Sequence, residues 1–129
     1  MVSAQRPESP NHTTERIIAC IYRVSNGLGS GFVEKVYENA LALELSRDGL
    51  DFQQQHPIRV LYMDQSVGDF VADFLVENSI VVELKAVKAL DDIHAAQCLN
   101  YLKATKFKIC LLVNFGRPRV ELRRIVLDY

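Results

Sequence analysis

Apolar residues recur at helical spacing in two segments near the start of the chain. Residues 13–27 open with threonines able to cap a helix, place apolar residues three or four positions apart, and end at Asn26 and Gly27, a pair typical of helix C-termini. Residues 30–49 carry a second apolar stripe and stop at a glycine. We therefore expect two consecutive helices.

The hydrophobic period shortens to two in the middle of the chain. Strands are predicted over residues 56–63, 69–76 and 80–87. Between the first two strands, the sequence DQSVG at residues 64–68 predicts a turn. Between the second and third, residues 77–79 predict a tight connection.

The last third of the chain predicts one helix and two strands. Residues 90–105 begin with aspartates that suit the positive end of a helix dipole. Residues 107–116 are an almost continuous apolar run, typical of a strand buried on both faces, and residues 119–127 read as a final strand. The order ααβββαββ predicts an α/β fold with one mixed β-sheet of about five strands flanked by helices.

Three charged residues interrupt the second and third predicted strands: Asp73, Glu83 and Lys85. Glu83 and Lys85 share a face because side chains alternate along a strand. With a three-residue connection Val76 pairs with Ile80 and Asp73 lies opposite Glu83, whereas a two-residue connection sends Asp73 to the other face. Facing carboxylates are unfavourable unless neutralised, and their oxygens suit Mg²⁺. The alternative is a solvated strand face on which Glu83 pairs loosely with Lys85.

Length and composition favour one soluble domain. The 129 residues are expected to form a single domain, 1–129, with residues 1–12 as a flexible arm. No apolar run approaches the roughly 18–20 residues of a membrane span, so we expect no membrane partner. The three cysteines, Cys20, Cys98 and Cys110, lie in apolar segments without metal-binding spacing. They predict buried thiols in a reducing cytoplasm.

Basic residues concentrate near the end of the chain. The formal net charge is +5 over residues 103–129 and −6 over residues 1–102. This segment could contact a phosphate backbone, and Arg117, Arg119 and Arg123 are its weaker candidates for substrate binding. It could equally be a solvated face balanced by the acidic remainder.

Three sequence blocks together resemble a known family. The segment GFVEKVY spans residues 31–37, VGDFVADFLVENSIVVELKAV spans 67–87, and HAAQCLNYLKAT spans 94–105. In this order and spacing they resemble the GxxExxY family, within the PD-(D/E)xK nuclease superfamily. The resemblance runs from about Thr14 to Val126, although Ala72 stands where the superfamily's name has a proline. It implies a restriction-endonuclease-like fold.

The resemblance also implies roles for individual residues. Asp73 and Glu83 would be ligands of Mg²⁺ or Mn²⁺, and Lys85 would be the catalytic lysine. Glu34 would be the additional acid on the second helix. Gln97 would be the polar residue on the helix that follows the E-x-K segment.

Helical spacing adds a separate argument for some of these positions. Glu34 sits at the edge of an apolar stripe, where a carboxylate is costly unless paired or metal-bound; alternatively it favours the helix dipole. His94, Gln97 and Tyr101 fall on one helix face, where they could border the hairpin and touch substrate. A histidine at such a position is more often a structural hydrogen-bonding residue.

These observations predict a metal-dependent nuclease that hydrolyses phosphodiester bonds of DNA or RNA. The main alternative is a non-catalytic module of the same fold that binds nucleic acid or protein, with a homodimer as one form. Hydrolysis of a small phosphate compound is a third possibility.

Overall fold

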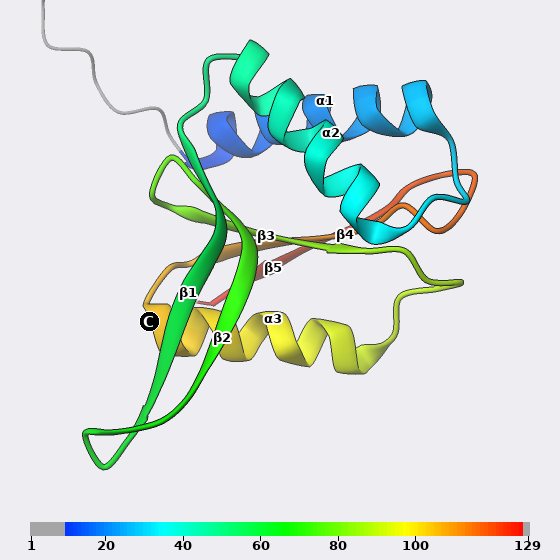
Figure 1. The fold of residues 1–129 in the computed structure, drawn as a ribbon. Helices are drawn as coiled ribbons and strands as arrows, with labels where there is room; N and C mark the ends of the chain where they lie inside the picture. The colour runs from blue at the N-terminus through cyan, green and yellow to red at the C-terminus, as the bar shows by residue number, and fades with distance from the viewer. Residues whose placement is uncertain (1–9, 128–129) are drawn as a thin grey trace, which may run out of the picture.

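The chain, described here by a computed structural model over residues 10–127, folds in the predicted order ααβββαββ (Figure 1). Its five strands form one mixed sheet, which confirms the expected fold class. The elements are α1 (Pro10–Leu28), α2 (Glu34–Arg47), β1 (Phe52–Tyr62), β2 (Gln65–Val76), β3 (Ile80–Lys85), α3 (Asp92–Thr105), β4 (Ile109–Asn114) and β5 (Glu121–Val126).

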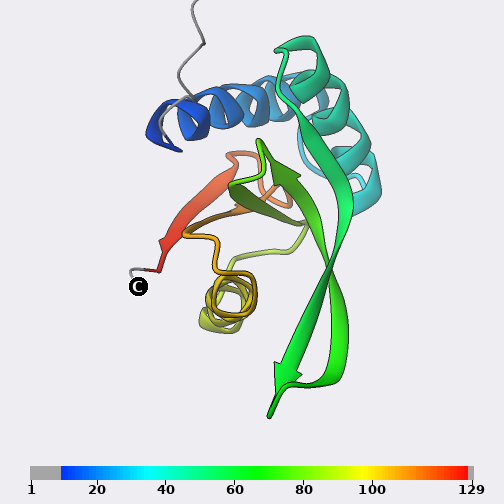
Figure 2. The same cartoon turned by 90° about the vertical axis from the view of Figure 1, so that its left-hand side faces the viewer.

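The strand order in the sheet is β1-β2-β3-β4-β5. Neighbouring strands are antiparallel except β3 and β4, which are parallel. A parallel pair needs a long crossover, and α3 supplies it. Helices α1 and α2 cover one face of the sheet and α3 covers the other, as the two views together show (Figures 1 and 2).

Alternation along the central strands divides the core into two layers. On β3, Ile80, Val82 and Leu84 pack in the layer under α1 and α2, whereas Val81 packs in the layer under α3. Every residue of β4 is buried, which confirms the strand covered on both faces. Glu83 of β3 is therefore a carboxylate within the covered part of the sheet, whereas Lys85 ends the strand at a half-buried position.

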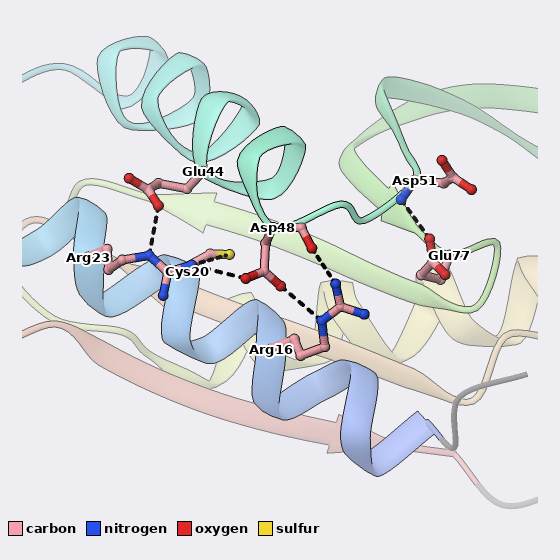
Figure 3. A network of polar contacts seen from close by, with 7 residues as sticks. All are labelled: Arg16, Cys20, Arg23, Glu44, Asp48, Asp51 and Glu77. Atoms are coloured by element: carbon pink, nitrogen blue, oxygen red, sulfur yellow. Dashed lines mark hydrogen bonds and ion pairs between the residues drawn. The ribbon is translucent and has the colours of Figure 1, made fainter.

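Ion pairs fasten α1 to the end of α2 (Figure 3). Arg16 Nε lies 2.8 Å from an Asp48 carboxylate oxygen, and Arg23 Nε lies 2.7 Å from a Glu44 carboxylate oxygen. These side chains are partly exposed, so each pair contributes about 0–1 kcal/mol. Their role is to orient α2, which carries acidic residues toward the sheet.

The N-terminal boundaries differ from the sequence-based expectation. α1 begins at Pro10, so residues 10–12 are helical rather than part of the expected arm, while residues 1–9 lie outside the described residues. The threonines expected to cap this helix are buried within it. α2 begins at Glu34 instead of near Ser30, because Gly29 and Gly31 adopt positive φ angles of 70° and 112° that end helical geometry.

The first two strands are longer than predicted. β2 begins at Gln65, so the predicted turn over residues 64–68 is wrong. The chain reverses at Met63 and Asp64, whose φ angles of 52° and 60° match the primed turns of two-residue hairpins. The polar residues that suggested a turn lie instead in a hairpin that projects from the body of the protein (Figure 2).

Two other expectations are confirmed. Val76 pairs with Ile80, as the three-residue connection requires. All three cysteines are buried free thiols. In addition, no helix within residues 10–127 is long and apolar enough to cross a membrane.

Candidate active site

β2 and β3 pair only from the connection as far as Phe74 and Val82. At the next position, Asp73 and Glu83, the side-chain carboxylates accept hydrogen bonds from backbone N–H groups of the neighbouring strand in place of backbone–backbone pairing. The Asp73 backbone N–H donates to Glu83 Oε1 at 3.1 Å, and the Leu84 backbone N–H donates to Asp73 Oδ2 at 2.7 Å. Each carboxylate is thus fixed by a backbone donor at the point where the strands separate.

Gln55 of β1 links this pair to α2. Its backbone is in the left-handed region, with φ of 57°, directly across from the point where β2 leaves β3. Its side-chain amide donates to Glu38 Oε1 at 2.7 Å and, more weakly, to Asp73 Oδ1 at 3.4 Å. One amide therefore orients a carboxylate of the sheet and a carboxylate of the helix.

Burial makes Glu83 the most perturbed acid of the site. Glu83 is only 5% exposed. Desolvation by burial is the main cause, and the charge of Asp73 the second, of the rise in the pKa of its carboxyl from 4.5 to about 9. The ionised form is costly in a dry environment, so Glu83 carries a proton at neutral pH unless a cation compensates its charge. Cys98 of α3 lies close enough to raise this pKa further.

The pKa values of two other acids shift in the same direction. Burial raises the pKa of Asp73, although its hydrogen bond from Leu84 opposes the shift. Partial desolvation and then the charge of Asp73 raise the pKa of Glu34. Each acid in this group favours its neutral form. A cation bound beside them would stabilise their ionised forms.

Lys85, half-buried at the end of β3, is the cation that these acids share. Its charge lowers the pKa values of Glu34, Asp73 and Glu83 alike, which means that the ammonium lies near all three. Glu83 and Lys85, two apart on one strand, and Asp73 on its neighbour are therefore gathered in one place.

Glu38 is a member of the site that sequence reasoning missed. It is 4% exposed and accepts hydrogen bonds from Lys35 Nζ at 2.9 Å and from the amides of Gln54 and Gln55. Its charge raises the pKa of Asp73, so the two carboxylates are neighbours. Glu34, which was expected at a costly position, is exposed. The signal in the sequence was the spacing of four residues between these glutamates, which places both on one helix face.

The predicted residues of α3 divide into two roles. His94 Nδ1 accepts a hydrogen bond from the Asp91 backbone N–H at 3.1 Å and completes a capping box, which is a structural role. Gln97 is exposed. Tyr101 stacks on Phe70 of β2 with ring centroids 4.2 Å apart. Burial and then the charge of Glu83 raise its pKa, so this phenol stays neutral.

The candidate arginines gather elsewhere. Arg117 lies 3.8 Å from a Glu121 carboxylate oxygen, and Arg123 donates to the Leu90 carbonyl oxygen at 3.4 Å. The hydrogen bond from the Asn114 amide, and to a smaller extent these two arginines, lower the pKa of Glu121. Arg119 is exposed in the connection before β5. No described contact joins these three side chains to the hairpin carboxylates.

The donor chemistry of the site fits a hard divalent cation. Asp73 and Glu83 offer oxygen ligands, and the raised pKa of Glu83 reports a buried acid whose charge lacks compensation. Within residues 10–127 no three acidic, histidine or cysteine side chains form a complete metal cluster. Asp73 and Glu83 would supply only part of the coordination of such an ion.

A mixed sheet with helices on both faces and an acid–acid–lysine cluster on one hairpin defines a restriction-endonuclease-like protein. The chain belongs to the PD-(D/E)XK nuclease superfamily, whose family model matches residues 11–125.

Two solved structures resemble it. The crystal structure of SSO0001 is 19% identical, with a TM-score of 0.55 over 92% of this chain and 60% of that chain. The alkaline exonuclease LHK-Exo from Laribacter hongkongensis is 13% identical, with a TM-score of 0.54 over 95% of this chain and 73% of that chain. At such identities the likeness shows the fold alone, and this chain spans 60% of the SSO0001 chain. No curated protein is significantly similar to the chain.

Proposed function

We propose that the protein is a metal-dependent nuclease that hydrolyses phosphodiester bonds of nucleic acid. The observation that carries the proposal is the convergence of Asp73, Glu83 and Lys85 at the point where β2 leaves β3, with both carboxylates fixed by backbone donors. Superfamily membership supports the same chemistry. The segment GFVEKVY supports a finer assignment to the GxxExxY family.

Asp73 and Glu83 would hold Mg²⁺ or Mn²⁺. When bound, the metal would lower the pKa of a water molecule and neutralise charge on the phosphate. Lys85 would support the attacking water or the phosphate, because its charge acts on both carboxylates. Glu38, through the amide of Gln55, would keep Asp73 oriented, and Glu34 would contribute its acid at the rim.

The remaining expectations fit this proposal in different ways. Gln97 would contact substrate rather than metal, because it is exposed on α3. The arginines around Glu121 are placed for weaker backbone contacts at most. The free thiols favour a reducing compartment such as the cytoplasm.

A non-catalytic binding module is the second candidate. Leu61, Tyr62 and Met63 at the tip of the β1–β2 hairpin are 58%, 68% and 81% exposed. Apolar side chains gathered on a projecting hairpin favour contact with a partner, which could be another protein or a second copy of the chain.

A cleavage assay separates these candidates. Single-stranded DNA, duplex DNA and RNA would be incubated with Mg²⁺ or Mn²⁺, and with EDTA as the metal-free control. We expect metal-dependent cleavage that falls at least about 100-fold in Glu83→Gln, which keeps an oxygen acceptor for the Asp73 N–H but cannot ionise. Asp69→Asn removes an exposed carboxylate from the neighbouring strand β2 and should cleave like the wild type.

A metal-binding measurement supports the assay without depending on turnover. Mg²⁺ should raise the melting temperature of the wild type at pH 8 and leave that of Glu83→Gln unchanged. Cleavage retained in Glu83→Gln would refute the assigned ligand. A folded wild type that cleaves none of the polymers would favour the binding module.

A further inference from the structure

A groove separates the projecting part of the β1–β2 hairpin from α3. We call this projecting part, residues 56–71, the arm, and the space beside it the arm–α3 groove. The groove encloses about 760 Å³ and is lined by Arg59 and Phe70 of the arm and by Gln97, Asn100, Tyr101 and Lys103 of α3, among others. Its volume is in the range of small-molecule and cofactor sites. In Figure 1 the arm crosses α3 near the C-terminal end of the helix, and in Figure 2, where α3 is seen end-on, the arm passes beside it.

The charged side chains of the groove are all basic. Arg59 and Lys103 are exposed, and Lys106 joins them at the end of α3. No described residue that lines the groove is acidic. Asp69 lies opposite Arg59 in the strand register, yet neither Arg59 nor Lys103 forms an ion pair within residues 10–127. The groove therefore attracts an anion.

The rest of the lining is aromatic, apolar and amide. Phe70 and Tyr101 stack with centroids 4.2 Å apart and join the arm to α3. Asn100 and Gln97 add amide donors and acceptors beside them. A small inorganic anion would use the cations and leave the aromatic surface without a function. A ligand with both phosphates and flat bases uses the whole lining.

That combination of cations and aromatic rings suits an unpaired nucleic-acid strand. Single strands are bound by basic grooves in which bases stack on aromatic side chains, and each stacked base contributes roughly 1–3 kcal/mol. A duplex keeps its bases stacked inside, so their faces are not available to the aromatic rings. The aromatic pair therefore distinguishes a single strand from a duplex.

The groove also begins beside the candidate active site. Phe70, which lines the groove, lies on β2 three residues before Asp73, and Tyr101 packs against the core cluster that contains Ala72, the direct neighbour of Asp73. A nucleic-acid strand bound in the groove would thus lead toward Asp73 and Glu83.

We propose that the arm–α3 groove binds a single-stranded nucleic acid and guides it to the carboxylates of Asp73 and Glu83. The proposal rests on the proposed nuclease function and specifies its substrate class. It assigns the main backbone contacts to Arg59 and Lys103 instead of the arginines around Glu121.

Fluorescence anisotropy with labelled 20-nucleotide oligo-dT and oligo-U tests the proposal. The full-length protein would be measured in EDTA, over a range of salt concentrations, with a duplex of the same length as the rival ligand. In Arg59→Ser/Lys103→Ser we expect Kd for single strands to rise about five- to tenfold and the salt slope to fall by about 1.4, since each cation contributes about 0.7 for single strands.

Two controls accompany these variants. Arg47→Ser removes one exposed charge from α2, on the opposite face of the sheet, and should bind like the wild type. Tyr101→Phe keeps the aromatic ring and should bind like the wild type, whereas Tyr101→Leu should weaken single-strand binding at least about fivefold. Circular dichroism confirms that each variant is folded.

The outcomes separate the groove from the proposed function. Groove variants that bind like the wild type, a preference for the duplex, or no binding by the wild type would each overturn the groove proposal. If the wild type cleaves nucleic acid and the groove variants cleave equally well, the nuclease stands and the groove falls. If binding depends on the groove and no cleavage occurs, the groove stands and the nuclease falls.

Discussion

The buried carboxyl of Glu83 predicts that the metal-free protein loses stability as pH rises. Its pKa is about 9 in the folded protein, against an ordinary value of 4.5. Between these values the unfolded chain releases the proton and the folded protein retains it. The folded state then binds more protons, so the free energy of unfolding falls by about 1.4 kcal/mol for each pH unit.

Replacing Glu83 by glutamine removes this titration. The amide oxygen can still accept the hydrogen bond from the Asp73 N–H, and the amide resembles the protonated acid in shape. Between pH 5.5 and pH 7.5 we expect the stability of the wild type to fall by about 3 kcal/mol relative to Glu83→Gln. All other side chains are the same in the two proteins, so the difference between their stability curves reports the change at position 83.

Urea denaturation followed by circular dichroism, in EDTA at several pH values, measures this difference. Asp69→Asn, which removes an exposed carboxylate from β2, should keep the pH dependence of the wild type. Parallel stability curves for the wild type and Glu83→Gln would refute the reasoning, because they would mean that Glu83 ionises in the folded protein as easily as in the unfolded chain.

Two further substitutions test the surroundings of the site. Gln55→Leu removes the amide that donates to Glu38 Oε1, so a buried acceptor loses its donor. The free energy of unfolding, measured by urea denaturation, should fall by about 1–3 kcal/mol. An unchanged value would contradict the link between β1 and α2. Gly116→Ala should lower the melting temperature strongly, because its Cβ would overlap the backbone of Val87, whereas Gly68→Ala meets nothing within 4 Å and should change it little. Equal melting temperatures for these two variants would refute the packing argument.

The hairpin of the site could be predicted from the sequence because its information is local. Alternation placed Glu83 and Lys85 on one face, and the length of the connection determined how Val76 pairs with Ile80. Once that pairing is fixed, Asp73 must come beside Glu83. The two-residue alternation of side chains, together with the length of one connection, was therefore enough to locate the charged cluster.

The supporting residues could not be predicted in the same way. Glu38 is buried only because β1 brings two glutamines against α2, and this contact joins residues 15–17 positions apart in the chain. Gln55 adopts a left-handed backbone conformation that its residue type does not indicate. Such features arise from packing between elements, which the periodicity of one segment does not encode.

The arm shows why local turn signals can mislead. Glycine, serine and glutamine near residue 66 are typical of a turn, but the same residues are tolerated in a strand that is exposed on both sides. The true reversal at Met63 and Asp64 has none of the usual Asn–Gly or Asp–Gly character. As a result the length of the arm, and with it the arm–α3 groove, was not apparent from the sequence.

The choice of glutamate at position 83 favours a cationic partner on energetic grounds. At pH 7 the raised pKa means that this side chain lowers the stability of the metal-free protein by about 3 kcal/mol relative to a group that never ionises. Glutamine could accept the same hydrogen bond from the Asp73 N–H without this cost. What glutamate offers in addition is a negative charge that forms only when a positive charge arrives to stabilise it. Under the proposed function, the glutamate whose ionised form the fold disfavours is therefore the residue that would bind the divalent cation beside Lys85.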